Sequence, residues 1–124
     1  MIPSHQRPSH KELSKKLGVA REGILDSRWA PASPFKLLPE LHSLQLFTAE
    51  DAARGLLEAL SEISPEHYVG RRPPEKAYEK RVYGREMFAF CWSSRRFRCA
   101  MYLKFVVTSD TVYFVSFHKS RGEV

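Results

Sequence analysis

Four side chains with possible roles in acid–base chemistry lie near the end of this chain, each pair separated by one apolar residue. Tyr102 and Lys104 are two positions apart, and so are Ser116 and His118. Residues spaced in this way share one face of a β-strand. Together they would supply proton donors, proton acceptors and positive charge for a phosphate. Cleavage of RNA without a metal needs this combination, because the attacking 2′-hydroxyl must lose a proton and the leaving 5′-oxygen must gain one.

We therefore interpret Tyr102 and His118 as an acid–base pair. Histidine has an unperturbed pKa of about 6.5 and exchanges protons near neutral pH. Tyrosine would do so only where neighbouring cations shift its pKa. Lys104, Arg96 and Arg98 would hold the phosphate. A polar, solvent-facing strand face without any catalytic role is the alternative interpretation.

Strands must position these side chains, and the sequence after residue 85 predicts three of them. Aromatic and β-branched residues alternate with other residues over about 86–92, 98–108 and 112–118. This alternation is typical of strands. We expect the three strands to form an antiparallel meander.

The turn between the last two strands decides which side chains share a face. A two-residue loop would place Tyr102 opposite Phe117, whereas a three-residue loop at 109–111 places it opposite His118. Only the three-residue loop gathers an entirely apolar face, as a core requires. That face comprises Met101, Leu103, Phe105, Val107, Tyr113, Val115 and Phe117. The sequence therefore predicts the three-residue loop.

The first part of the chain predicts a helix and then a less regular segment. Ser9 as N-cap indicates a helix over about 10–17, which Gly18 would end. Residues 20–28 fit a helix or an edge strand. Residues 29–40 contain three prolines and predict a connection with little regular structure.

The clearest helix begins after Thr48. It carries one apolar stripe, formed by Ala52, Ala53, Leu56, Leu57 and Leu60. Ser64 and Pro65 fit the N-cap and first position of a further short turn or helix. Residues 71–81 are charged, contain a double proline and predict a loop leading to a short helix.

The composition fits one small domain with a basic half. The 124 residues are 43% hydrophobic and carry a formal net charge of +6. Residues 67–124 hold 12 basic and 5 acidic side chains, and residues 1–66 hold 8 basic and 9 acidic ones. We expect a single α+β domain over 1–124, a small antiparallel sheet with N-terminal helices on one face, after a loose lead-in at 1–8. The local positive field indicates a polyanionic partner, such as nucleic acid or an acidic protein.

Several classes of protein do not fit this sequence. No apolar run approaches the roughly 20 residues of a membrane span, and the N-terminal segment lacks the apolar region of a secretory signal. We expect a cytoplasmic protein that does not bind membranes. Cys91 and Cys99 have no metal-finger spacing, so we expect no metal and no cofactor. The two cysteines fit small buried thiols, or a bridge across a hairpin.

Two sequence segments form the predicted C-terminal hairpin: Tyr102-Leu103-Lys104-Phe105 and then Val115-Ser116-Phe117-His118-Lys119. They resemble the Tyr-Leu-Lys and Val-Ser-Phe-Lys strands in the C-terminal hairpin of MqsR-family toxins. Leu60-Ser61-Glu62 and His67-Tyr68 resemble that family's upstream segments, and the resemblance covers about residues 10–119. It implies a RelE-like α+β fold and a ribosome-independent mRNA interferase that cuts single-stranded RNA. It also implies neutralisation by a cognate antitoxin protein.

Carried over by position, the resemblance places the family's catalytic tyrosine on Tyr102. The family's C-terminal lysine falls on His118, or on Lys119 if the register shifts by one. Two positions depart from the family, because its further lysine falls on Val69 and its glutamine falls on Ala89. The catalytic set is then either rebuilt around histidine or degenerate.

These observations together predict a metal-independent endoribonuclease toxin that leaves a 2′,3′-cyclic phosphate. Arg71 and Arg72 lie close enough in sequence to replace the missing lysine and, with Lys119, would bind RNA at the rim. Phe97 or Tyr83 would stack on a base. Two alternatives remain: a non-catalytic nucleic-acid-binding or regulatory protein on the same fold, and a protein-interaction module with an acidic partner.

Overall fold

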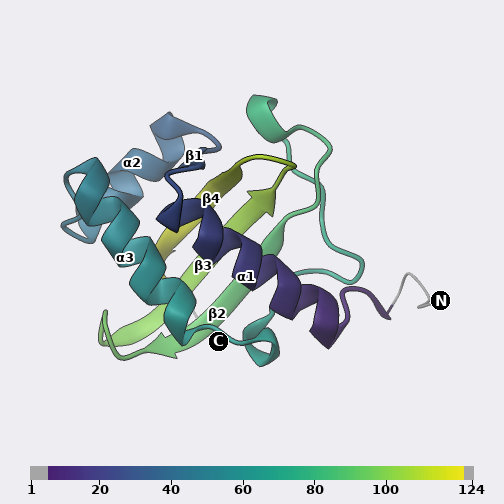
Figure 1. Ribbon diagram of the computed structural model, residues 1–124. Helices are drawn as coiled ribbons and strands as arrows, with labels where there is room; N and C mark the ends of the chain where they lie inside the picture. Colours follow the sequence, from purple (N-terminus) through teal and green to yellow (C-terminus); the bar gives the residue numbers. More distant parts are fainter. Residues whose placement is uncertain (1–5, 122–124) are drawn as a thin grey trace.

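The computed structural model of the chain describes residues 6–121, and within this range it has three α-helices and four strands. In chain order they are α1 (His10–Leu25), β1 (Trp29–Pro31), α2 (Pro34–Ser43), α3 (Ala49–Glu62), β2 (Phe88–Ser94), β3 (Cys99–Val107) and β4 (Val112–Lys119). Two short 3-10 helices, η2 (Pro65–His67) and η3 (Lys80–Val82), lie between α3 and β2. Helices α1 and α3 cross one face of the sheet (Figure 1).

The four strands form one sheet in the order β1-β4-β3-β2. Strands β2, β3 and β4 are the predicted antiparallel meander. Strand β1 adds a short parallel edge to β4, so the sheet is mixed rather than purely antiparallel. The α+β class predicted from the sequence is therefore confirmed. The interpretation of residues 29–40 as a connection with little regular structure is wrong, because β1 and the first part of α2 lie in this range.

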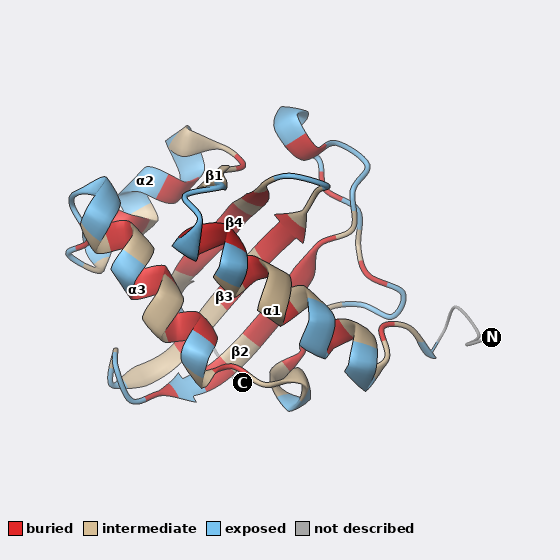
Figure 2. Cartoon of the chain, viewed as in Figure 1, coloured by how far each residue is buried: buried red, intermediate tan, exposed pale blue. Residues whose placement is uncertain are grey.

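The sheet buries apolar side chains on both faces. The main core lies between the helices and the sheet and includes Leu17, Leu56, Phe90 and Phe105 (Figure 2). A smaller cluster lies on the opposite face, where the segment 70–87, which we name the covering loop, crosses the sheet. That cluster comprises Ala32, Ala77, Val82, Met87, Val106 and Val115. The covering loop hides only part of the second face.

Two helix predictions need correction. Helix α1 does not end at Gly18 but continues to Leu25, because its buried stripe of Leu13, Leu17, Ala20 and Ile24 runs on without interruption. Gly23 allows α1 to lie close to β4, since a Cβ at this position would meet Val112 Cγ2 at 2.6 Å.

Helix α2 forms despite its prolines: Pro34 occupies the first turn, where no N–H bond is lost. Burial of Leu37 and Leu41 then fixes the helix against the core.

The start of the described chain is held by side-chain contacts. Residues 1–5 of the predicted lead-in lie outside the described residues. Arg7 pairs with Glu12 at 2.5 Å and with Glu86 at 3.0 Å. Arg72 donates a hydrogen bond of 2.8 Å to the carbonyl oxygen of Pro8. Residues 6–8 are thus docked against α1 and the covering loop, in contrast to the loose segment predicted.

The β3–β4 hairpin combines both registers considered from the sequence. Tyr102 faces His118 and Lys104 faces Ser116, as the three-residue loop predicts. Nearer the turn, Phe105 faces Phe114 and Val107 faces Val112. Residue 115 is therefore an extra residue, a β-bulge on β4, and the loop at 108–111 has four residues rather than three. Tyr113 and Val115 consequently belong to the cluster on the second face and not to the main core.

Candidate functional site

The uncovered part of the second sheet face carries the polar side chains singled out from the sequence. We name it the open strand face; it comprises Cys91, Tyr102, Lys104 and His118, whereas Ser116 on the same side of the sheet is buried. Cross-strand pairing places Cys91 and His118 on either side of Tyr102, and Ser116 beside Lys104. Tyr102, Lys104 and His118 are half-buried. The sequence prediction that these three side chains share one face is confirmed.

Tyr102 and His118 lie ring against ring. Their ring centroids are 5.2 Å apart and the ring planes differ by 22°. Nδ1 of His118 lies 2.7 Å from the carbonyl oxygen of Lys119. Because a carbonyl can only accept, Nδ1 carries the proton in this contact. Nε2 is then the nitrogen available to exchange a proton with a ligand.

Tyr102 and Lys104 line a small pocket of about 130 Å³, which we name the strand pocket. The remaining wall comes from β2 and from the beginning of the covering loop: Val69, Gly70, Arg71, Glu75, Met87 and Ala89. The backbone N–H of Val69 donates to the carbonyl of Ala89 at 2.9 Å, which ties the loop to β2 at this point. The pocket therefore brings a phenol and an amine together with an arginine and a carboxylate.

Burial shifts the pKa values of the two strand-pocket groups in opposite directions. Removal from water lowers the pKa of the Lys104 ammonium, and the charge on Lys36 lowers it further. Burial also raises the pKa of Tyr102. The sequence interpretation required cations to make the tyrosine a proton acceptor, and this condition is not met. Lys104 is the group of the pair that burial moves towards a role as a base.

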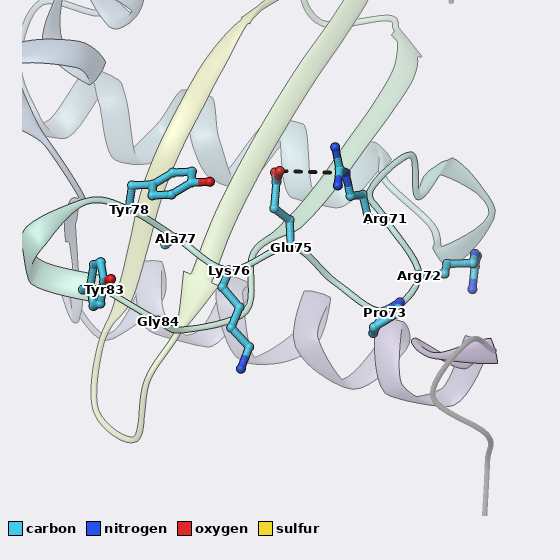
Figure 3. A pocket seen from close by; sticks show the side chains of 9 residues that line it. All are labelled: Arg71, Arg72, Pro73, Glu75, Lys76, Ala77, Tyr78, Tyr83 and Gly84. Carbon is cyan, nitrogen blue, oxygen red and sulfur yellow. Dashed lines mark ion pairs between the residues drawn. The ribbon is translucent and has the colours of Figure 1, made fainter.

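The two arginines predicted at the rim have different surroundings. Arg71 lies beside Glu75, with Nε 3.9 Å from a carboxylate oxygen (Figure 3). Both residues line the strand pocket. The side chain of Arg72 points away from those of Arg71 and Glu75 (Figure 3). Its guanidinium lies 5.1 Å from the centre of the Tyr68 ring. Arg71 is therefore placed to contact a ligand, and Arg72 holds the start of the chain.

Arg96 and Phe97 lie away from the open strand face. Arg96 Nε is 2.7 Å from Glu58 Oε1 on α3. The Phe97 ring packs edge-on against Phe117 of the main core, with centroids 5.4 Å apart. Both residues thus belong to the helix-covered side, where they cannot join Tyr102. Arg98 is exposed in the same turn, with a φ of 61°.

A carboxylate of α3 holds that turn, which comprises residues 95–98. Glu62 accepts hydrogen bonds from Trp92 Nε1 at 2.9 Å and Ser94 Oγ at 2.7 Å. It also accepts from the backbone N–H groups of Arg95 at 3.0 Å and Arg96 at 2.9 Å. Burial alone would raise the pKa of Glu62, but these bonds outweigh it and hold that pKa below its usual value.

A second hollow, of about 310 Å³, lies where β4 ends beside α2. His118 and Lys119 form one wall, and Glu40 of α2 forms another. Glu40 Oε1 accepts a hydrogen bond of 2.8 Å from the backbone N–H of Phe117. His118 therefore faces both this hollow and the ring of Tyr102. Lys119 is exposed beside it.

Three nearby residues were not identified from the sequence. Glu75, Lys36 and Glu40 all influence the pKa of Lys104. They come from the covering loop and from α2, a helix that the prolines concealed. No periodicity in the sequence connects these segments with the last two strands. Cys91 and Cys99 are both free thiols in the structure.

Comparisons with other proteins add no family assignment. No protein-family model, no curated protein and no solved structure matches the chain. Among residues 6–121, no helix has both the length and the apolar character needed to cross a membrane. Function must therefore be argued from the site itself.

Proposed function

We propose that this protein is an endoribonuclease that cleaves single-stranded RNA at the open strand face without a metal, as the toxin of a toxin–antitoxin pair. One observation carries the catalytic part: Tyr102, Lys104 and Arg71 line one pocket, with His118 stacked on Tyr102. Four positions that the toxin resemblance singles out also lie close together. Val69, Ala89 and Tyr102 line the strand pocket, and His118 is the cross-strand partner of Tyr102. The toxin part of the proposal rests on that resemblance.

The proposed reaction uses each group according to its surroundings. Neutral Lys104 takes the proton from the 2′-hydroxyl, and the 2′-oxygen forms a bond to phosphorus. The bond from phosphorus to the 5′-oxygen breaks, and His118, which enters this step as an imidazolium with a proton on each ring nitrogen, gives that oxygen the proton of Nε2. Tyr102 stays protonated and donates a hydrogen bond to the phosphate, and Arg71 offsets its growing negative charge. The products are a 2′,3′-cyclic phosphate and a 5′-hydroxyl.

A cleavage assay with EDTA present tests this proposal. Wild-type protein should cut unstructured RNA, and we expect His118→Ala to lower the rate about 100-fold, a normal effect of losing a general acid. Tyr102→Phe should lower it about tenfold, because it removes only a hydrogen bond to the phosphate. Lys15→Ala, an exposed change on α1, is the control and should cut like wild type. No cleavage by wild type, or equal cleavage by all variants, would show the assignment to be wrong.

The dependence of the rate on pH tests the role of Lys104 as a base. Because the pKa of Lys104 is lowered, the neutral amine becomes more abundant as pH rises towards that pKa. A general acid becomes less abundant in its protonated form as pH rises, and this opposes the increase in wild-type protein, so the base is tested in the His118→Ala variant. We expect the residual cleavage rate of His118→Ala to increase from about pH 6 to about pH 9, after the background hydrolysis of RNA is subtracted. Lys104→Arg keeps the charge but cannot lose its proton, so the double variant His118→Ala/Lys104→Arg should lack this increase. A residual rate of His118→Ala that falls over the same range would contradict the assignment.

A second function, RNA binding without scission, is favoured by the wall of the strand pocket. Val69 and Ala89 are apolar where the resembling family has a lysine and a glutamine. The basic half of the chain would then bind RNA through its phosphates, with an affinity that falls steeply as salt is added. Salt-dependent binding with intact RNA after long incubation would establish this function in place of the first.

A further inference from the structure

The covering loop presents two large aromatic rings to solvent. Tyr78 is 81% exposed and Tyr83 is 74% exposed, although Ala77 and Val82 beside them are buried. Both tyrosines lie at the same end of the loop (Figure 3). The chain thus buries its small side chains here and leaves the large ones outside, which indicates that the rings have a partner other than the core.

The loop that carries these rings is firmly anchored. Ala77 N–H donates to the carbonyl of Arg85 at 2.8 Å, and Gly84 N–H donates to the carbonyl of Ala77 at 3.0 Å. Gly84 has a φ of +80°, which a side chain would disfavour. Val82 and Ala77 are packed in the cluster on the second sheet face. Because the backbone is already ordered, a ligand that stacks on the rings has little loop entropy to overcome.

The two rings line a wide hollow of about 670 Å³ together with cationic side chains. Arg71 and Lys76 are part of its wall, and Glu75 is its acidic member (Figure 3). Residues 70–87 hold six basic and three acidic side chains. Exposed aromatic rings among cations are the arrangement by which proteins hold unpaired bases and the phosphates that connect them.

This hollow shares part of its wall with the strand pocket. Arg71 and Glu75 line both the hollow and the strand pocket. One extended RNA chain can therefore place a phosphate against Lys104 and Arg71 and its next bases against the two tyrosines. We propose that Tyr78 and Tyr83 form a stacking platform for bases that flank the cleaved phosphate of single-stranded RNA. The inference rests on the proposed function for its ligand, but it concerns binding and not the chemical step.

Single-stranded RNA is favoured over the other polyanions because of the rings. A duplex keeps its bases stacked on one another and offers a tyrosine no free base face. An acidic protein would pair with the cations but leaves two exposed phenol rings without a role. A single strand uses both features of the hollow at once.

Binding of an RNA that cannot be cut tests the platform separately from catalysis. The probe is a labelled single-stranded RNA of about 12 nucleotides in which every 2′-oxygen is methylated, so that no 2′-hydroxyl can attack. Fluorescence anisotropy should show that Tyr78→Ala and Tyr83→Ala each weaken binding about tenfold, and that the double variant weakens it further. Tyr78→Phe and Tyr83→Phe keep the rings and should bind within about twofold of wild type. Phe47→Ala, an exposed aromatic change next to α3, is the matched control and should bind like wild type.

The outcomes separate this inference from the proposed function. Weaker binding by the alanine variants supports the platform, even if wild-type protein fails to cut unmodified RNA. Unchanged binding by the double alanine variant overturns the platform, even if unmodified RNA is cut. A duplex of the same sequence should bind at least about tenfold more weakly than the single strand. Equal binding of the two, or no binding of the single strand, also overturns the inference and assigns the loop to a partner of another class.

Discussion

Replacing Lys104 with methionine should lower the rate of RNA cleavage by at least about 100-fold, the largest catalytic effect that we expect from any single change. General-base catalysis is typically worth 10²- to 10⁴-fold in rate (about 3 to 5 kcal/mol). Lys104 is the amine that lines the strand pocket, and burial already lowers its pKa. Methionine keeps the length of the side chain and removes both the proton acceptor and the charge. A single-turnover assay with excess protein measures the chemical step directly.

Loss of folding would not explain such a result. Because the pKa of Lys104 is lower in the folded chain than in the unfolded one, the unfolded chain binds the proton more strongly. Protonated Lys104 therefore weakens folding, and this penalty disappears as pH rises towards the ordinary lysine pKa of about 10.4. Lys104→Met should melt at or above the wild-type temperature. A variant that cuts like wild type would remove Lys104 from the mechanism.

The cross-strand pairing of Tyr102 with His118 could be predicted from the sequence, because only this register of the last two strands turns the apolar residues around Tyr102 towards the core. The error in the loop length has a physical cause in Val115. An apolar residue was expected to enter the one core, but the covering loop makes a second apolar cluster on the other face. Val115 is buried there, and the bulge lets the two ends of one hairpin keep different registers. Alternation along one strand carries no sign of such a second cluster.

Arg96 and Phe97 show a different limit of sequence interpretation. Arg96 was predicted to hold the phosphate and Phe97 to stack on a base, on the expectation that both lie near Tyr102. Their place is decided instead by contacts with α3 and with Phe117, which lie far away in the sequence. The strand pocket has the same character, because the fold of the covering loop brings Glu75 to Lys104. Regular periodicity predicts the strands that carry a site, whereas the loop walls depend on tertiary contacts.

The turn at 95–98 leads to the largest stability effect that we expect outside the core. Glu62→Ala should lower the free energy of unfolding by about 3 kcal/mol, because it removes an acceptor of four hydrogen bonds. Trp92 and Ser94 are buried, so water cannot fully replace the lost carboxylate. Urea denaturation followed by the fluorescence of the two tryptophans, Trp29 and Trp92, measures the change.

The neighbouring Glu58 supplies a matched control on the same helix. Glu58→Ala removes an ion pair with Arg96 in which the side chains are 45% and 40% exposed, and ion pairs open to solvent contribute less than about 1 kcal/mol. The pKa of Glu62 is lowered in the folded protein, so its contribution is present above the ordinary glutamate pKa of about 4.3 and is lost as pH falls through the folded value. The stability difference between wild type and Glu62→Ala should accordingly shrink in acid. Equal losses in Glu58→Ala and Glu62→Ala at neutral pH would mean that Glu62 contributes only as a surface charge, and that packing of Phe97 on Phe117 holds the turn.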